Sequence, residues 1–379
     1  MIRLRTVFAL TAASALVLTG CAATPQEGGN DSALVQVVAS TNVYGSLAEQ
    51  IGGERVEVTS IITSATQDPH SYEATARDRL AVSEADLLIE NGGGYDHFME
   101  LLRDGVSAPV ITAAEFSHDY PGAEHDHGDD DHADDDHADH DHADDDHADD
   151  DHADHDHADE ADDHDHADEA DDHDHADEEH DHDHAEEGDD HDHGEDDHAG
   201  HNHIEGFNEH VWFDAHTMIH VVEQIATELT ALDPAGAAEF AASATAVTDE
   251  LRAIEGEQDA LHTEFEGRTV VMTEPLPGYL AAALGLDNVT PEGFAEAVEG
   301  GADVAPATLL ATLTLLEGGT VDALLTNLQT GGGETARAEE AAAASDVPIV
   351  AFSELLEPGT SYAEWMRDAM TKLADALRS

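Results

Sequence analysis

The chain has 379 residues, of which 88 are acidic and only 12 are basic, so its formal net charge at pH 7 is −76. A surface of this sign repels nucleic acid and anionic lipid, and it attracts cations. Nucleic-acid binding is therefore excluded. The chain holds one cysteine, so an internal disulfide is excluded as well.

Residues 1–20 have the pattern of a bacterial signal peptide. Arg3 and Arg5 precede an apolar run, VFALTAASALVL, and apolar runs of transmembrane length are absent elsewhere. The following LTGC is similar to a lipobox, in which the cysteine is lipidated, so we expect Cys21 to carry an acyl anchor. Residues 21–33 would then form a flexible, lipidated spacer. The prediction is an extracytoplasmic lipoprotein of the bacterial cell membrane; the alternative is an ordinary cleaved signal with an incidental thiol.

The segment after this spacer alternates strand-like and helix-like stretches. Short apolar runs predict buried strands, and apolar residues at helical spacing between them predict helices. This βαβ rhythm is typical of a parallel sheet. The predicted strands are 34–40, 56–62, 85–91 and 108–112, and the predicted helices are 43–51 and 95–104.

Residues 118–203 consist almost entirely of His, Asp, Glu, Ala and Gly. They hold 23 of the 29 histidines and 42 of the 88 acidic residues, without a lysine or arginine. With so little to bury, this tract is expected to be disordered. Its imidazoles suit Zn, Cu and Ni, but the neighbouring acids favour protons in competition, so we expect many weak, fast-exchanging metal sites. Representative low-affinity ligands are His125, His127, His132, His137, His140, His142, His191, His193, His201 and His203.

A solvating acidic spacer is the alternative interpretation of this tract, but such a spacer has no use for so many imidazoles. We therefore expect a metal-handling protein.

The second half of the chain begins with helical patterns and then returns to alternating strands and helices. Helices are expected at 216–231 and 234–265, and a proline opens the second of them. The fold class predicted is α/β, with two parallel-rich lobes joined by a long rigid helix and interrupted by a disordered insertion. The further strands are 268–273, 321–327 and 347–352, with a closing helix at 361–377. The first lobe takes 34–117 and 204–232, the insertion 118–203, the linking helix 233–266 and the second lobe 267–379.

Two of the six histidines outside the insertion lie in loops with unusual neighbours. His70 follows a predicted strand in TQDPHSYE, where Asp-Pro favours a turn that projects the next side chain, and His210 lies in NEHVWFD. Glu274 and Glu354 follow strands of the second lobe, at the strand ends where open α/β sheets bind ligands. The spacing alone leaves open whether these four residues form one metal site.

The other four histidines point less clearly to a site. His216 and His220 are four residues apart and could form a metal pair, or they could simply lie on an exposed helix face. His97 and His262 are expected to be structural or solvated. Zincin, GxSxG and P-loop motifs are missing, so we do not expect an enzyme.

Five further patterns can be compared with known families as a set. They are TQDPHSYE, IENGGGYDHFMELL, NEHVWFDA, EPLPGYLAAALGL and VPIVAFSELLEPGTSYAEWM. Together these stretches resemble the metal-binding lipoproteins of ABC importers for zinc and manganese, the zinc-uptake or cluster A-I type of solute-binding protein. The resemblance implies that His70 and His210 are ligands from the first lobe. It places Glu274 where zinc members often have a third histidine and manganese members a glutamate, and Glu354 where the family usually has an aspartate.

The resemblance also implies two α/β lobes bridged by a rigid helix, a His-rich loop between the first two ligands, and a monomer that docks on an ABC permease with its ATPase. Two imidazoles and two carboxylates suit Zn2+ or Mn2+. The His-rich tract favours zinc as the transported ligand. The alternatives are a manganese receptor, a surface zinc buffer or chaperone acting through the tract, and a zinc hydrolase, which would need an open coordination position and a base.

Overall fold

The computed structural model describes residues 34–64, 67–122, 204 and 206–379. The predictions for the signal peptide, for Cys21 and for the histidines named from the insertion lie outside these residues. All of the described residues belong to one unit of the chain. Among them, no helix is long and apolar enough to cross a membrane.

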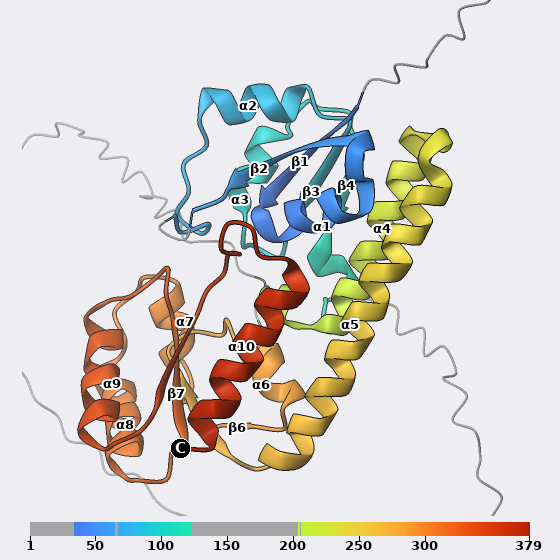
Figure 1. Ribbon diagram of the computed structural model, residues 1–379. Helices are drawn as coiled ribbons and strands as arrows, with labels where there is room; N and C mark the ends of the chain where they lie inside the picture. Colours follow the sequence, from blue (N-terminus) through green and yellow to red (C-terminus); the bar gives the residue numbers. More distant parts are fainter. Residues whose placement is uncertain (1–33, 65–66, 123–203, 205) are drawn as a thin grey trace, which may run out of the picture. The chain divides into compact units, whose positions relative to one another are not determined.

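The first half of the chain forms a four-stranded parallel sheet in the order β2-β1-β3-β4 (Figure 1). Val37 of β1 pairs with Val58 of β2 on one side and with Leu87 of β3 on the other. The central strands are buried on both faces, as parallel strands covered by helices are. The strands are β1 (Val35–Thr41), β2 (Val56–Ile62), β3 (Leu87–Glu90) and β4 (Val110–Thr112), and the helices between them are α1 (Asn42–Gly52), α2 (Ala76–Ser83) and α3 (His97–Leu102).

A second parallel sheet follows in the order β6-β5-β7-β8. Helix α10 closes the chain, and it begins with a capping box in which the Ser361 side chain accepts a hydrogen bond from the Glu364 amide. The strands are β5 (Thr269–Met272), β6 (Asp287–Asn288), β7 (Ala323–Asn327) and β8 (Ile349–Phe352). The helices are α6 (Gly278–Ala283), α7 (Phe294–Glu299), α8 (Pro306–Glu317), α9 (Gly333–Ala344) and α10 (Tyr362–Leu377).

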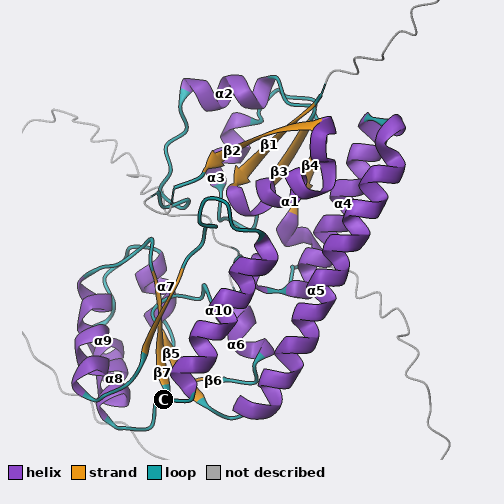
Figure 2. Cartoon of the chain, viewed as in Figure 1, coloured by secondary structure: helices purple, strands orange, loops and turns teal. Residues whose placement is uncertain are grey.

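Helices α4 (Ala215–Leu232) and α5 (Ala237–Phe265) connect the two sheets (Figure 2). Asp214 caps α4 by accepting a hydrogen bond from the His216 amide, and a 3-10 turn at Pro234–Gly236 leads into α5. With 29 residues, α5 is about 44 Å long. It packs against α1 and α4 of the first lobe and against α6 and α10 of the second.

One cluster of buried apolar residues runs through both lobes. Val37 in the first sheet, Leu251 in α5 and Leu325 in the second sheet all belong to it. The predicted fold class, two parallel-sheet α/β lobes joined by a long helix, is confirmed. The residue ranges that we assigned to the lobes stay a prediction.

The first residues of the segment expected to be disordered, 118–122, belong to the described part of the chain. The Tyr120 ring packs edge-on against Phe207, with the ring centroids 5.5 Å apart. Tyr120 therefore has a place in the first lobe, because an aromatic ring has apolar surface to bury and the Asp and His residues that dominate the segment do not.

Candidate metal centre

His70 lies in the loop after β2, and a local turn sets its position. The Asp68 carboxylate accepts hydrogen bonds from the His70 amide, at 2.9 Å, and from the Ser71 hydroxyl, at 2.7 Å. This is the turn that Asp-Pro was expected to favour. The imidazole is buried and meets the Tyr95 ring edge-on, with the centroids 4.9 Å apart.

His210 is fully buried just before α4, and its ring is oriented by Asn208. The Asn208 Oδ1 atom lies 2.8 Å from His210 Nδ1 and also accepts the His210 amide, at 3.1 Å. Because an amide oxygen only accepts, the ring proton lies on Nδ1, and Nε2 carries the lone pair with which a neutral imidazole binds metals. The Asn208 Nδ2 amide group donates to the Pro275 carbonyl at 3.0 Å, and this hydrogen bond links the loop to the second lobe.

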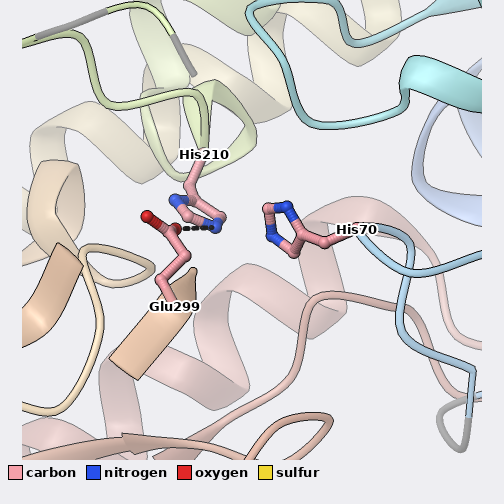
Figure 3. A group of neighbouring side chains, drawn as sticks. All are labelled: His70, His210 and Glu299. Carbon is pink, nitrogen blue, oxygen red and sulfur yellow. Dashed lines mark ion pairs between the residues drawn. The ribbon is translucent and has the colours of Figure 1, made fainter. Parts of the chain in front are cut away.

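Glu299, the last residue of α7, completes a three-residue group with the two histidines. Figure 3 shows the three side chains pointing toward one another from three separate segments of the chain. One candidate ligand atom from each residue lies within 4.8 Å of the other two. The Glu299 side chain is 6% exposed, so the group is largely closed to solvent.

The separation of His210 and Glu299 within this group suits a metal better than a hydrogen bond. His210 Nε2 and Glu299 Oε1 are 3.5 Å apart, whereas N–H···O hydrogen bonds are about 2.7–3.2 Å long. Two ligand atoms about 2.1 Å from a tetrahedral zinc ion are about 3.4 Å apart. The pair therefore lies close to the separation that zinc imposes on its ligands.

The two predicted carboxylates lie together under the side chain of Asn327, at the end of β7. The Asn327 Nδ2 amide group donates to Glu274 Oε2 at 2.6 Å and to Glu354 Oε1 at 2.7 Å. Glu354 also accepts from the Tyr95 hydroxyl at 2.8 Å, and Glu274 accepts from the Thr330 hydroxyl. Both carboxylates are buried.

Burial and mutual repulsion raise the proton affinity of these acids. Burial raises the pKa of Glu299 to about 9, with repulsion from Glu209, Glu274 and Glu354 as the next causes. Burial also raises the pKa of Glu354 to about 7, although hydrogen bonds from Asn327 and Tyr95 act in the opposite direction. A bound cation would offset both effects, because it favours the ionised form of every neighbouring carboxylate.

The structure thus brings His70 and His210 together, and it adds Glu299, which sequence reasoning missed. Glu274 and Glu354 lie close by but outside the three-residue group. No local motif distinguishes Glu299 from other glutamates, because its contact with His210 joins residues that are far apart in the chain. His262 has a structural contact, with Nδ1 3.1 Å from the Ala283 carbonyl.

Comparison with known proteins shows which family the chain resembles over most of its length. The profile of the family described as "ZnuA: Zinc-uptake complex component A periplasmic" matches residues 37–376. The manganese-binding lipoprotein MntA of Halalkalibacterium halodurans is 34% identical over 93 residues, which cover 24% of this chain and 31% of that protein. The manganese ABC transporter substrate-binding lipoprotein PsaA of Streptococcus pneumoniae is 32% identical over 96 residues, covering 24% and 30%. The chain therefore matches about a third of the length of these relatives.

Solved structures share the fold over nearly their whole length. The periplasmic zinc binding protein TroA from Treponema pallidum has a TM-score of 0.60 at 15% identity, covering 91% of this chain and 99% of that one. FpvC from Pseudomonas aeruginosa, in complex with Mn2+, has a TM-score of 0.57 at 18% identity, covering 91% and 98%. At such identities these likenesses bear on the fold alone.

Proposed function

This chain belongs to the family of periplasmic zinc-uptake component A proteins, and from this premise we propose that it is an extracytoplasmic receptor for a divalent metal. It captures Zn2+ as its transported ligand and delivers it to an ABC permease driven by an ATPase. The relatives named above are a manganese-binding lipoprotein and an ABC transporter lipoprotein. In this proposed function the protein binds and releases the metal ion and catalyses no reaction.

One observation carries the proposal, namely the convergence of His70, His210 and Glu299 within 4.8 Å of one another. Two imidazoles and a carboxylate are a ligand set found in zinc sites. The Asn208 contact orients His210 before a metal arrives, as the partners of metal-binding histidines do. We propose these three residues as ligands.

One coordination position of a tetrahedral zinc ion remains, and the two carboxylates that Asn327 contacts are the candidates for it. Glu274 and Glu354 have strong hydrogen bonds of their own, but each carboxylate also retains lone pairs for a cation. Repulsion from both of them contributes to the raised pKa of Glu299, so the three negative groups act on one another. We propose that one of the two, Glu354 or Glu274, supplies the fourth ligand.

Zinc is proposed ahead of manganese for two reasons. The 3.5 Å between His210 Nε2 and Glu299 Oε1 is close to the edge of a tetrahedral zinc site. The histidines of the insertion also suit zinc, because manganese prefers oxygen ligands. Manganese is the second candidate, since curated relatives are named for it and the site is rich in carboxylates.

Two further parts of the chain, which lie wholly or mostly outside the described residues, belong to the proposed function. Lipidation at Cys21 would hold the protein at the membrane, and residues 118–203 would collect zinc near it. Both rest on the sequence patterns, and the first is supported by the relatives named as lipoproteins.

The experiment uses the tryptophan nearest the site as its reporter. Trp212 is buried, and its ring centroid lies 5.1 Å from that of His210. The chain has two tryptophans and neither lies in residues 118–203, so emission from the full-length protein is not a direct signal of metal in the insertion. Replacing the other tryptophan, Trp365→Phe, leaves Trp212 as the single emitter.

Zinc is added in a chelator buffer to the Trp365→Phe protein and to the same protein with His70→Ala. We expect the emission midpoint to move to at least about 100-fold higher free zinc when His70 is removed, because losing even an orienting partner of a ligand costs about 10–100-fold. His97→Ala, which removes an exposed histidine, is the control and should leave the midpoint unchanged. A midpoint that is the same with and without His70 would refute the proposed centre.

A further inference from the structure

We propose that His216, His220 and Glu255 form a second, solvent-exposed zinc site on the surface shared by α4 and α5. The inference is independent of the proposed transport function, because it rests on side chains that are not part of the buried centre. His216 and His220 come from α4, and Glu255 comes from α5.

The two imidazoles are already spaced for a shared ion. They stand one helical turn apart, on the same face of α4, and their ring centroids are 5.1 Å apart at an interplanar angle of 84°. Two imidazoles bound to one tetrahedral zinc ion at about 2.1 Å have centroids about 5 Å apart. The pair can therefore chelate zinc without a change in the helix.

Glu255 adds a carboxylate from the neighbouring helix. Its Oε1 atom lies 3.4 Å from His216 Nδ1, which matches the separation of about 3.4 Å expected for two ligands of a tetrahedral zinc ion. Glu223, one turn after His220, brings a further carboxylate oxygen to 3.8 Å from His220 Nδ1. Two helices thus supply two imidazoles and, beside one of them, a carboxylate oxygen. The three ligand atoms do not all lie within 4.8 Å of one another as those of the buried centre do, so zinc would bind after rotation of these exposed side chains.

The frame of this site is rigid although its side chains are exposed. Asp214 caps the first turn of α4, and buried apolar residues, among them Val222 and Leu251, hold α4 and α5 in one core. The exposed fractions of the side chains are 66% for His216 and 33% for Glu255. Zinc would therefore reach this site directly from solvent, and would bind more weakly and exchange faster than at the buried centre.

The site lies near the start of the His-rich segment. His118, the first residue of that segment, has its Nδ1 atom 3.9 Å from Asp214 Oδ2, two residues before His216. An ion bound at the second site would therefore lie on the same part of the folded unit as His118.

His97 and Glu100 provide a matched control within the same chain. They also form an exposed histidine–glutamate pair on a helix, with 3.3 Å between His97 Nδ1 and Glu100 Oε2. Within the described part of the chain, His97 has no second imidazole beside it. An ordinary surface pair and a metal site are therefore distinguished by comparing His97 with His216 and His220.

The test is histidine modification with diethyl pyrocarbonate, read residue by residue by mass spectrometry on the full-length protein. At micromolar free zinc, modification of both His216 and His220 should fall at least about fivefold, while modification of His97 should be unchanged. With Glu255→Gln, the zinc concentration that protects the pair should rise at least about tenfold. Glu250→Gln, an exposed acid on the same helix, should have no effect.

Two results would overturn the proposal: protection of His216 and His220 no greater than that of His97, or an unchanged midpoint with Glu255→Gln. The Trp212 emission titration is run on the same variants, and it should not change because these residues lie outside the buried centre. A failure of the surface site is thereby distinguished from a failure of the proposed receptor function.

Discussion

Glu90, at the end of β3, is a buried carboxylate whose ionisation should weaken the fold at neutral pH. It is 2% exposed, and burial raises its pKa from 4.5 to about 7, with repulsion from Asp96 as the next cause. The Arg103 guanidinium, at 3.1 Å, and the Thr112 hydroxyl lower the pKa but do not compensate for burial. The folded protein therefore binds the Glu90 proton more tightly than the unfolded chain does.

The sign and size of the effect follow from linkage. A raised pKa in the folded state stabilises the fold below pH 4.5, and this stabilisation is lost as the pH rises through about 7. Each pKa unit is worth about 1.4 kcal/mol, so Glu90 should contribute about 3 kcal/mol to the loss of stability between about pH 4 and pH 8. Glu90→Gln cannot ionise, and its stability should lack this part of the pH dependence.

The assay is urea unfolding of the metal-free protein at pH 4 and at pH 8. The quantity compared is the change in the free energy of unfolding between the two pH values. Any effect of the glutamine side chain on stability that does not depend on pH therefore cancels. We expect this change to be about 3 kcal/mol smaller in Glu90→Gln than in the unmodified chain. Glu317→Gln, at an exposed position of the second lobe, is the control. A difference below about 1 kcal/mol would refute the reasoning.

Two further predictions concern the buried centre. Glu299→Gln should raise the zinc midpoint of the Trp212 emission at least about 100-fold, because it removes a charged ligand. Glu296→Gln, on the exposed side of the same helix, is the control and should have no such effect. Equal midpoints for Glu299→Gln and the unmodified residue would remove Glu299 from the ligand set. Asn327→Asp should destabilise the metal-free protein by about 3 kcal/mol or more at pH 8, because two hydrogen bonds to carboxylates are replaced by repulsion, and zinc should restore part of the loss. Thermal unfolding with and without zinc measures the effect of Asn327→Asp. An unchanged stability of the metal-free protein would contradict the role given to the Asn327 amide.

Local patterns in the sequence were enough to predict the fold class and to single out two histidines. Apolar strand patterns are local, so both β1, which is buried on both faces, and β2, which lies at the edge of the sheet, could be placed from the sequence. The turn at His70 was also predictable, because it is made by the neighbours of that residue in the chain. The family resemblance, carried by short motifs, agrees with the profile match over residues 37–376.

Tertiary structure decided which carboxylates surround those histidines. Glu299 is one glutamate among many in the sequence, and only the folded chain places its Oε1 atom 3.5 Å from His210 Nε2. The pairing of Glu274 with Glu354 likewise depends on Asn327. The two glutamates follow β5 and β8, and Asn327 ends β7, the strand that lies between those two in the sheet. Contacts of this kind join residues far apart in the chain, so no local pattern records them, and only the packing of strands and helices brings their charges together.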